Sequence, residues 1–294
     1  MKKTILLIGL LVLPISAVQD VPKPEPPPFK ATLEYRALQP GEVVRVSLQS
    51  HLDIRQAHVR FLEKKYPLWQ TSDPHKFMTF IGLDLNMQPG DYPLSVSVLF
   101  EDGALHSSNK EIQVLVKEFP VKKLWVEEKF VTPPAEVLER IRTESALLGS
   151  IFSISTPRWL GDGSFIIPSP GKAAPNFGER RYFNDQPRSP HTGVDISSPL
   201  GAPVKASNGG QVVLADDLYY AGNTVIIDHG LGMFSFYCHF SVIHAKRGDR
   251  VQKGDIIGEV GATGRVTGPH LHWSIRVRNS RIDPFSLLAL DLSK

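Results

Sequence analysis

Short stretches in which apolar and polar side chains alternate recur along this chain, and they constrain its fold more than any other feature. Every second residue is apolar in residues 44–48, 94–98 and 112–116. Successive side chains of a strand point to opposite faces, so this alternation predicts strands with one buried face. Turn signals rich in proline and glycine, such as Gln39–Gly41, separate the runs. We therefore expect an immunoglobulin-like β sandwich over residues 29–119.

The second half of the chain is also composed of short strands. Apolar or alternating runs occupy residues 211–214, 224–227, 234–240, 256–260 and 271–277. Residues 251–258 predict a strand pair around the turn at Gly254 and Asp255. No run is long and periodic enough for a substantial helix, which argues against a parallel sheet with crossover helices. We expect a second domain, mainly β, over residues 161–294.

One helix is expected between the two domains, over residues 132–149. Thr132 is a suitable N-cap, Pro133 suits the first helical position, and Gly149 is a natural stop. Apolar residues at helical spacing give the segment one apolar stripe. Residues 120–160 then form a helical linker, although the helix could instead pack onto the second domain.

The N-terminus has the pattern of a secretory signal peptide over residues 1–17. Two lysines precede an apolar run from Ile5 to Leu13, and small residues follow it. The run is shorter than the roughly 20 residues that span a bilayer. Residues 18–28 are proline-rich and predict an extended tether. We expect export to the periplasm or cell envelope without stable membrane insertion after cleavage; an uncleaved anchor is the alternative.

Charge and histidine content narrow the class of function. The 33 Lys and Arg residues against 30 Asp and Glu give a formal charge of +3, a small surplus that argues against nucleic acid as a partner. Six of the ten histidines fall between His191 and His272, while those of the first domain are scattered. The clustered histidines are therefore the candidates for chemistry. Cys238 is the single cysteine, which excludes an internal disulfide.

The spacing of these histidines suits a shared site. Residues four apart along a strand lie about 13 Å from each other, so His191 and Asp195 meet only if the chain turns between them. We expect Gly193 to allow this turn through a positive φ. His270 and His272 are two apart, so strand geometry places both imidazoles on one face.

The sequence around His239 suggests a third contribution to the same site. Strand alternation would place Tyr237 and His239 on one face and Cys238 on the other. An Asp and two or more His with an open fourth position make a catalytic zinc site. Further histidines beside the metal can act as base, acid or oxyanion stabiliser.

Several segments resemble the lysostaphin-type zinc endopeptidases of bacterial cell walls. They are Asn176-Phe177-Gly178-Glu179-Arg180-Arg181, His191-Thr192-Gly193-Val194-Asp195-Ile196, Gly222-Asn223-Thr224-Val225-Ile226-Ile227-Asp228-His229-Gly230, Tyr237-Cys238-His239 and Thr267-Gly268-Pro269-His270-Leu271-His272-Trp273. The resemblance covers roughly residues 165–285, with the segments in the family's order. It implies a small antiparallel β core with a metal groove on the sheet.

The resemblance also implies roles for five residues. His191, Asp195 and His272 would bind one zinc ion, and His239 and His270 would serve in catalysis. The implied substrates are the peptide stems of peptidoglycan, cut at D-alanyl-diaminopimelate bridges or at the glycine bridges of Gram-positive walls. Relatives that have lost ligands activate cell-wall amidases without being enzymes. This sequence keeps all five residues, which favours the enzyme over such a binding module.

Other residues have simpler interpretations. His229 fits a turn or a supporting role as well as a place near the groove, and His244 fits the surface. Cys238 is expected to be a buried core residue rather than a nucleophile. Arg180 could contact a substrate carboxylate or cap local carbonyls. The N-terminal domain could contact the groove, either to inhibit the peptidase or to deliver substrate.

Overall fold

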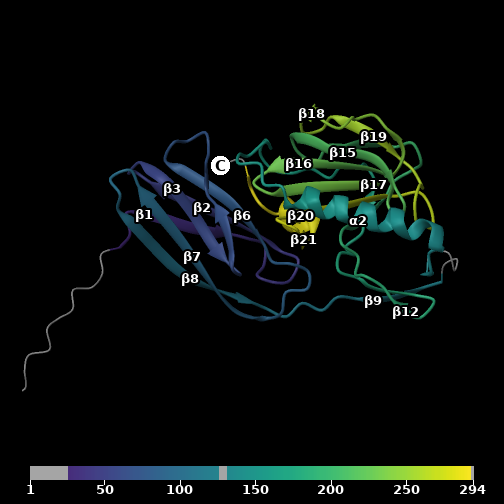
Figure 1. Cartoon of the computed structure of the whole chain (residues 1–294), viewed down its shortest axis with the longest axis horizontal. Coiled ribbons are helices and arrows are strands. Elements are labelled where there is room, and N and C mark those ends of the chain that lie inside the picture. The colour runs from purple at the N-terminus through teal and green to yellow at the C-terminus, as the bar shows by residue number, and fades with distance from the viewer. Residues whose placement is uncertain (1–25, 126–130, 293–294) are drawn as a thin grey trace, which may run out of the picture.

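The computed structural model describes residues 26–125 and 131–292 (Figure 1). The predicted signal peptide and all but the last three residues of the predicted tether lie outside the described residues. In the part of the chain that is described, no helix has the length and apolar character needed to cross a membrane.

Two four-stranded sheets form the N-terminal part. One contains β1 (Phe29–Glu34), β2 (Val43–Ser50), β6 (Lys76–Gly82) and β5 (Trp69–Gln70) in that order, and the other contains β4 (Lys64–Pro67), β3 (Ile54–Phe61), β7 (Gly90–Phe100) and β8 (Leu105–Val114). All their pairings are antiparallel. Alternate apolar residues of both sheets, among them Val46 and Val96, form one buried cluster. The expected sandwich is confirmed.

A ten-stranded sheet dominates the C-terminal part. Its main path is β10 (Lys172–Ala173), β13 (Val194–Ser197), β20 (Leu271–Val277), β17 (Met233–Ile243), β16 (Gly222–Gly230), β15 (Gly210–Leu218) and β18 (Arg250–Val251). Off this path, β19 (Ile256–Val260) pairs with β14 (Pro203–Lys205) and β17, and β21 (Ser280–Ile282) pairs with β20. Every pairing is antiparallel, so the mainly β fold is confirmed.

The prediction of a strand pair over residues 251–258 is wrong in its pairing. Strands β18 and β19 do flank the turn at Gly254, whose φ is +93°. However, β18 pairs with β15, while β19 pairs with β14 and β17. Strand β19 thereby has two partners in the large sheet, where a two-stranded hairpin would offer one.

The linking helix is shifted toward the C-terminus relative to the prediction. A short 3-10 turn, η1 (Ala135–Val137), leads into α2 (Leu138–Ser153), so Thr132 is not the N-cap and Gly149 lies inside the helix. Ile151 and Phe152 extend the apolar stripe and are buried against residues of the large sheet. Their burial outweighs the cost of about 1 kcal/mol for a glycine within a helix. Figure 1 shows α2 lying along the large sheet.

A third, small sheet was not anticipated. Its order is β12 (Gln186–Pro187), β11 (Arg180–Phe183) and β9 (Val121–Leu124). Strand β9 belongs to the linker and pairs in parallel with β11, from Arg180 opposite Val121 to Phe183 opposite Leu124. The linker is therefore joined to the C-terminal half before α2 begins.

The two halves also share apolar packing. Val43, Phe80 and Leu85 of the N-terminal half belong to the buried cluster of the large sheet, and Phe80 contacts Trp159 with ring centroids 5.3 Å apart. The backbone N–H of Val43 donates to Ser286 Oγ at 2.8 Å, in α3 (Pro284–Leu288). The sandwich is thus fixed against the edge of the large sheet that carries β21 and α3.

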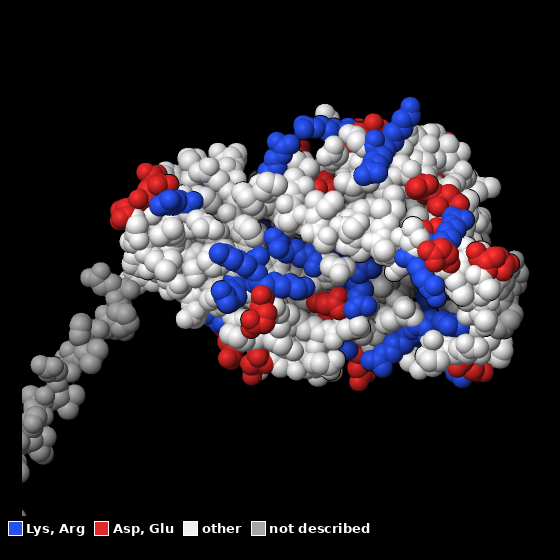
Figure 2. Space-filling model, in the orientation of Figure 1, with Lys and Arg blue, Asp and Glu red and all other residues white. Residues whose placement is uncertain are grey.

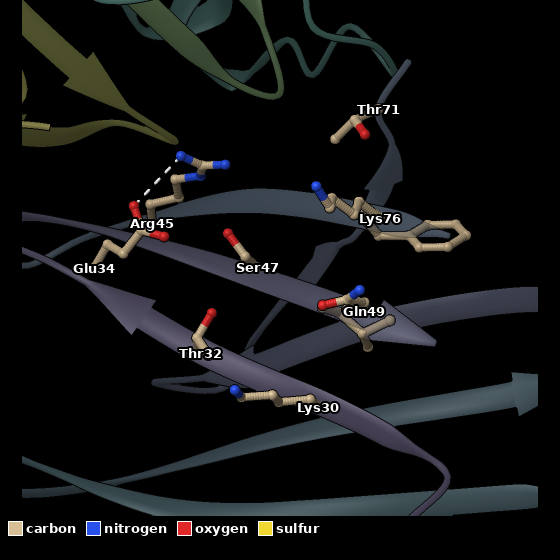
Figure 3. Close-up of a pocket in the computed structure, with 10 residues that line it drawn as sticks. Lys30, Thr32, Glu34, Arg45, Ser47, Gln49, Thr71 and Lys76 are labelled. Atoms are coloured by element: carbon tan, nitrogen blue, oxygen red, sulfur yellow. Dashed lines mark hydrogen bonds and ion pairs between the residues drawn. The ribbon is translucent and has the colours of Figure 1, made fainter. Parts of the chain in front are cut away.

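Charged side chains do not form one continuous basic surface on the face in Figure 2, where acidic side chains lie among the Lys and Arg residues. A cavity of about 200 Å³ lies on the outer face of the sheet of β1, β2 and β6 (Figure 3). Its lining includes Lys30, Arg45 and Lys76 but only one carboxylate, that of Glu34. With no histidine or cysteine in its lining, this cavity does not offer a zinc site.

Candidate active site

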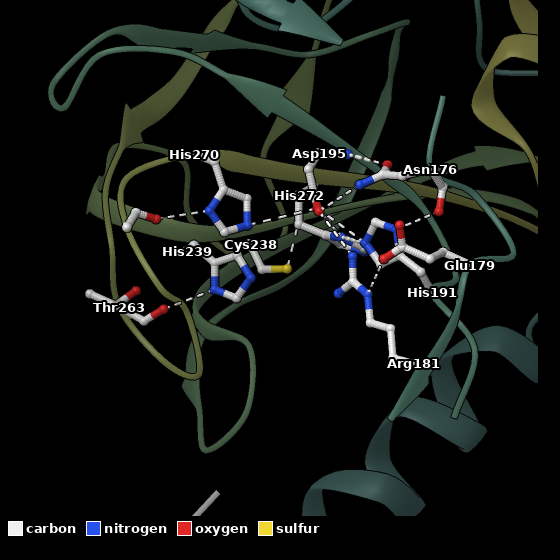
Figure 4. A network of polar contacts seen from close by, with 11 residues as sticks. Asn176, Glu179, Arg181, His191, Asp195, Cys238, His239, Thr263, His270 and His272 are labelled. Carbon is white, nitrogen blue, oxygen red and sulfur yellow. Dashed lines mark hydrogen bonds and ion pairs between the residues drawn. The ribbon is translucent and has the colours of Figure 1, made fainter. Parts of the chain in front are cut away.

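Two adjacent strands bring the predicted ligand residues together. Asp195 in β13 lies directly opposite His272 in β20, so their side chains share one face of the sheet. His191 lies in the loop just before β13. Leu271 and Trp273 alternate with His272 and are fully buried on the other face. The prediction that His270 and His272 project to one side is confirmed by the 3.7 Å between His270 Nε2 and Asp195 Oδ1 (Figure 4).

Three donor atoms form a compact triangle. His191 Nε2 lies 2.8 Å from His272 Nδ1 and 3.1 Å from Asp195 Oδ1, and the latter two atoms are 3.0 Å apart. Of the His, Cys, Asp and Glu side chains in the described part of the chain, these three lie close enough together to hold a metal ion. Ligands bound to tetrahedral zinc at about 2.0–2.1 Å would be roughly 3.3 Å apart, so the donors fit this ion.

The ligand side chains are oriented by their neighbours. The His191 Nδ1–H donates to the Asn176 carbonyl at 2.9 Å, which leaves Nε2 with its lone pair toward the triangle. Asp195 accepts hydrogen bonds at Oδ2 from Asn176 Nδ2 and Arg181 Nη2. Burial alone would raise the pKa of Asp195, but hydrogen bonds and charge from His191 and His272 hold it well below its ordinary range.

Gly193 acts differently from the prediction. The chain does bend at this residue, but its φ is not in the positive range. A Cβ at Gly193 would lie 2.4 Å from the Trp273 carbonyl oxygen and 2.8 Å from His272 Nε2. Glycine is required here because β20 and a ligand imidazole pass too close for any side chain.

The prediction that Tyr237 and His239 share a face is wrong. Cys238 lies opposite His272 in the β17–β20 pairing and therefore faces the same side as that ligand. Tyr237 points into the core, where its hydroxyl contacts Ser207. His239 is an extra residue in the β16–β17 register, with φ +70°. This bulge breaks the alternation and turns its ring toward His270.

His239 and His270 lie beside the triangle as a pair, with ring centroids 4.9 Å apart. Their Nδ1–H groups donate to the carbonyls of Thr263 at 2.8 Å and Gly268 at 2.9 Å. These bonds leave both Nε2 atoms as proton acceptors. Burial, followed by the charges of His272 and His270, lowers the pKa of His239 to about 3. Burial likewise lowers the pKa of His272 to about 4.

The remaining candidates lie away from the triangle or support it. His229 is fully buried and held by Gly209 and Ser235, and His244 is exposed beside Glu259. Burial raises the pKa of the Cys238 thiol well above its ordinary value, so this buried residue is a poor nucleophile.

Arg180 is exposed, whereas the neighbouring Arg181 reaches Asp195 at 3.2 Å. The sequence patterns did not point to Arg181. The alternation of β11 could have indicated that adjacent arginines face opposite sides.

Comparison with known proteins agrees with this geometry. Residues 189–284, which include all five predicted site residues, match peptidase family M23. The chain carries a domain of peptidase family M23. Peptidoglycan DD-endopeptidase ShyA of Vibrio cholerae is 42% identical over 120 residues, which are 40% of this chain and 28% of that protein. DD-carboxypeptidase/endopeptidase Mpg of Neisseria meningitidis is 40% identical over 97 residues, or 33% and 22% of the two chains.

The whole chain has a structural counterpart as well. A crystal structure of a Pseudomonas aeruginosa protein assigned to peptidase M23 is 26% identical, with a TM-score of 0.64. The match covers 87% of this chain and 96% of the other. It therefore includes the N-terminal sandwich as well as the M23 domain. The residues that match this chain make up less than a third of the length of ShyA and of Mpg.

Proposed function

We propose that this protein is an exported, zinc-dependent endopeptidase that hydrolyses peptide cross-links of peptidoglycan. The observation that carries the proposal is the triangle of His191 Nε2, Asp195 Oδ1 and His272 Nδ1, with distances of 2.8–3.1 Å. Two nitrogens and one carboxylate oxygen leave a fourth position open, as in catalytic rather than structural zinc sites. The two remaining histidines beside the triangle support a hydrolytic role.

The hydrogen bonds support separate roles for the metal ligands and for the two other histidines. Zinc held by His191, Asp195 and His272 would supply a Lewis acid and lower the pKa of a water molecule toward about 7. His239 and His270 each present an unprotonated Nε2 to the same space. Either atom can take a proton from the water that attacks the scissile carbonyl. The protonated imidazole can then donate to the oxygen on which negative charge develops.

We infer D-alanyl-diaminopimelate bridges as the bonds cut. ShyA is named as a peptidoglycan DD-endopeptidase and Mpg as a DD-carboxypeptidase/endopeptidase. The signal-peptide pattern at residues 1–17 supports export, which would bring the enzyme to the periplasm where such cross-links lie.

Digestion of purified sacculi tests the proposal. We expect the parent with zinc to release uncross-linked stem peptides, identified by mass spectrometry, and a chelator or His191→Ala to abolish their release. His270→Ala should lose at least about 100-fold in turnover while keeping its zinc, because it removes a proton-transfer group but no ligand. Full activity of His270→Ala would contradict the roles assigned here. Hydrolysis seen only after an amidase is added would instead indicate the binding module.

A further inference from the structure

The two oxygens of Asp195 have different surroundings. Oδ1 faces His191, His272 and His270 at 3.1, 3.0 and 3.7 Å. Oδ2 faces away from them and accepts from Asn176 Nδ2 at 2.9 Å and Arg181 Nη2 at 3.2 Å (Figure 4). A carboxylate held in this way offers a single oxygen to an ion. Asn176 and Arg181 therefore decide which way Asp195 points.

Arg181 is itself held on its other edge. Its Nε–H donates to Glu179 Oε1 at 3.0 Å, and Glu179 is only 7% exposed. A guanidinium bonded to two carboxylates keeps one orientation because its donors form a rigid planar fork. The backbone of the same segment reaches His191, whose N–H donates to the Glu179 carbonyl. The chain from Asn176 to Arg181 thus contacts two of the three proposed ligands.

The interdomain linker fixes this segment from outside. Strand β9 pairs with β11, which carries Arg181, and β9 is the edge strand of its sheet. Arg180 N–H donates to the Pro120 carbonyl at 2.8 Å, and Asn184 N–H to the Leu124 carbonyl at 3.0 Å. Phe119 covers Gly178 so closely that a Cβ there would lie 2.0 Å from its ring. Linker strand β9 therefore supports the strand that carries Arg181.

We propose that Asn176 and Arg181 are positioning residues that hold Asp195 as a one-oxygen ligand, and that linker strand β9 sets zinc affinity through Arg181. The inference rests on the zinc site of the proposed function. Residues that orient metal ligands change metal affinity about 10–100-fold when they are replaced. A change in the linker should therefore alter zinc affinity although β9 contains no ligand.

Two pairs of variants of the full chain test each step by zinc titration against a chromophoric chelator. Arg181→Gln should weaken zinc binding about 10–100-fold, and Arg181→Lys should recover part of the loss because it restores the charge beside Oδ2. The Pro120 and Leu124 carbonyls face β11, so by strand alternation the Lys122 N–H does too and the Lys123 N–H faces away. Lys122→Pro should weaken zinc binding at least about fivefold, and its matched control Lys123→Pro less than about twofold.

Each outcome decides the inference. Unchanged zinc affinity of Arg181→Gln would overturn the positioning role, and equal affinities of the two proline variants would overturn the role of β9. Far-ultraviolet circular dichroism identifies a misfolded variant, and the arginine pair then still tests the inference. These measurements need no activity. A parent that binds zinc tightly but digests no sacculi would refute the proposed function and leave this inference standing.

Discussion

His229 gives the protein a defined dependence of stability on pH. The imidazole is fully buried, its Nδ1–H donates to the Gly209 carbonyl at 2.7 Å, and Nε2 accepts from the Ser235 hydroxyl at 2.7 Å. Burial lowers its pKa from 6.5 to about 4, against a smaller opposing effect of the bond to Gly209. The folded protein therefore keeps His229 neutral in a pH range where the unfolded chain protonates it.

The sign and size of the effect follow from proton linkage. Between pH 6.5 and about pH 4 the unfolded state binds up to one more proton than the folded state, so the free energy of unfolding falls as the pH falls through this range. The stabilisation is complete above pH 6.5 and is lost as the pH approaches about 4. The whole difference corresponds to about 3 kcal/mol. Between pH 8 and pH 5, His229 should account for about 2 kcal/mol of lost stability.

Urea unfolding of the chelated protein, followed by tryptophan fluorescence, measures this loss. The comparison is His229→Asn, which keeps a donor for the Gly209 carbonyl but does not titrate. The free energy of unfolding of both proteins falls toward pH 5, because each also contains His239 and His272, whose pKa values are lowered in the folded state. The parent should lose about 2 kcal/mol more than the variant. Parallel curves for the two proteins would refute the reasoning.

Three further predictions concern packing, the domain contact and the metal. Gly193→Ala should lower the free energy of unfolding, measured in urea, by about 1–3 kcal/mol and should weaken zinc binding. The reason is that the added Cβ would overlap the Trp273 carbonyl and press on His272. An unchanged free energy of unfolding would contradict this. Asp84→Ala removes the acceptor of Arg281 Nη2 at 2.5 Å and Nε at 3.1 Å, so calorimetry should show a loss of about 1–3 kcal/mol, and a neutral result contradicts it. Zinc at about 1,000 times its dissociation constant should add about 4 kcal/mol over the chelated protein; equal melting temperatures would argue against a structured zinc site.

Much of the fold could be predicted from local pattern. Period-two alternation located the strands of the sandwich because each of its sheets has one buried face, and short apolar runs between turn signals located those of the large sheet. The same rule placed His270 and His272 together, because β20 begins at Leu271, directly after His270, and contains His272. These predictions succeeded where the residues that decide the geometry are close in sequence.

The failures have a common physical origin in long-range contacts. The bulge at His239 depends on the register between β16 and β17. Helix α2 continues past Gly149 because Phe152 packs on Phe234, with ring centroids 5.6 Å apart. The role of Arg181 depends on a parallel pairing between segments about 60 residues apart in the chain. No local pattern encodes these contacts.

The apolar contacts of Val43, Phe80 and Leu85 with the large sheet have a consequence for how such a protein can evolve. Because these side chains complete the interior of the M23 domain, its sequence is adapted to one particular neighbour. If the same domain followed a different N-terminal module, Trp159 would lose its contact with the Phe80 ring and Ile282 its close approach to Gly82. We expect substitutions on the two sides of this interface to be correlated among related proteins rather than independent.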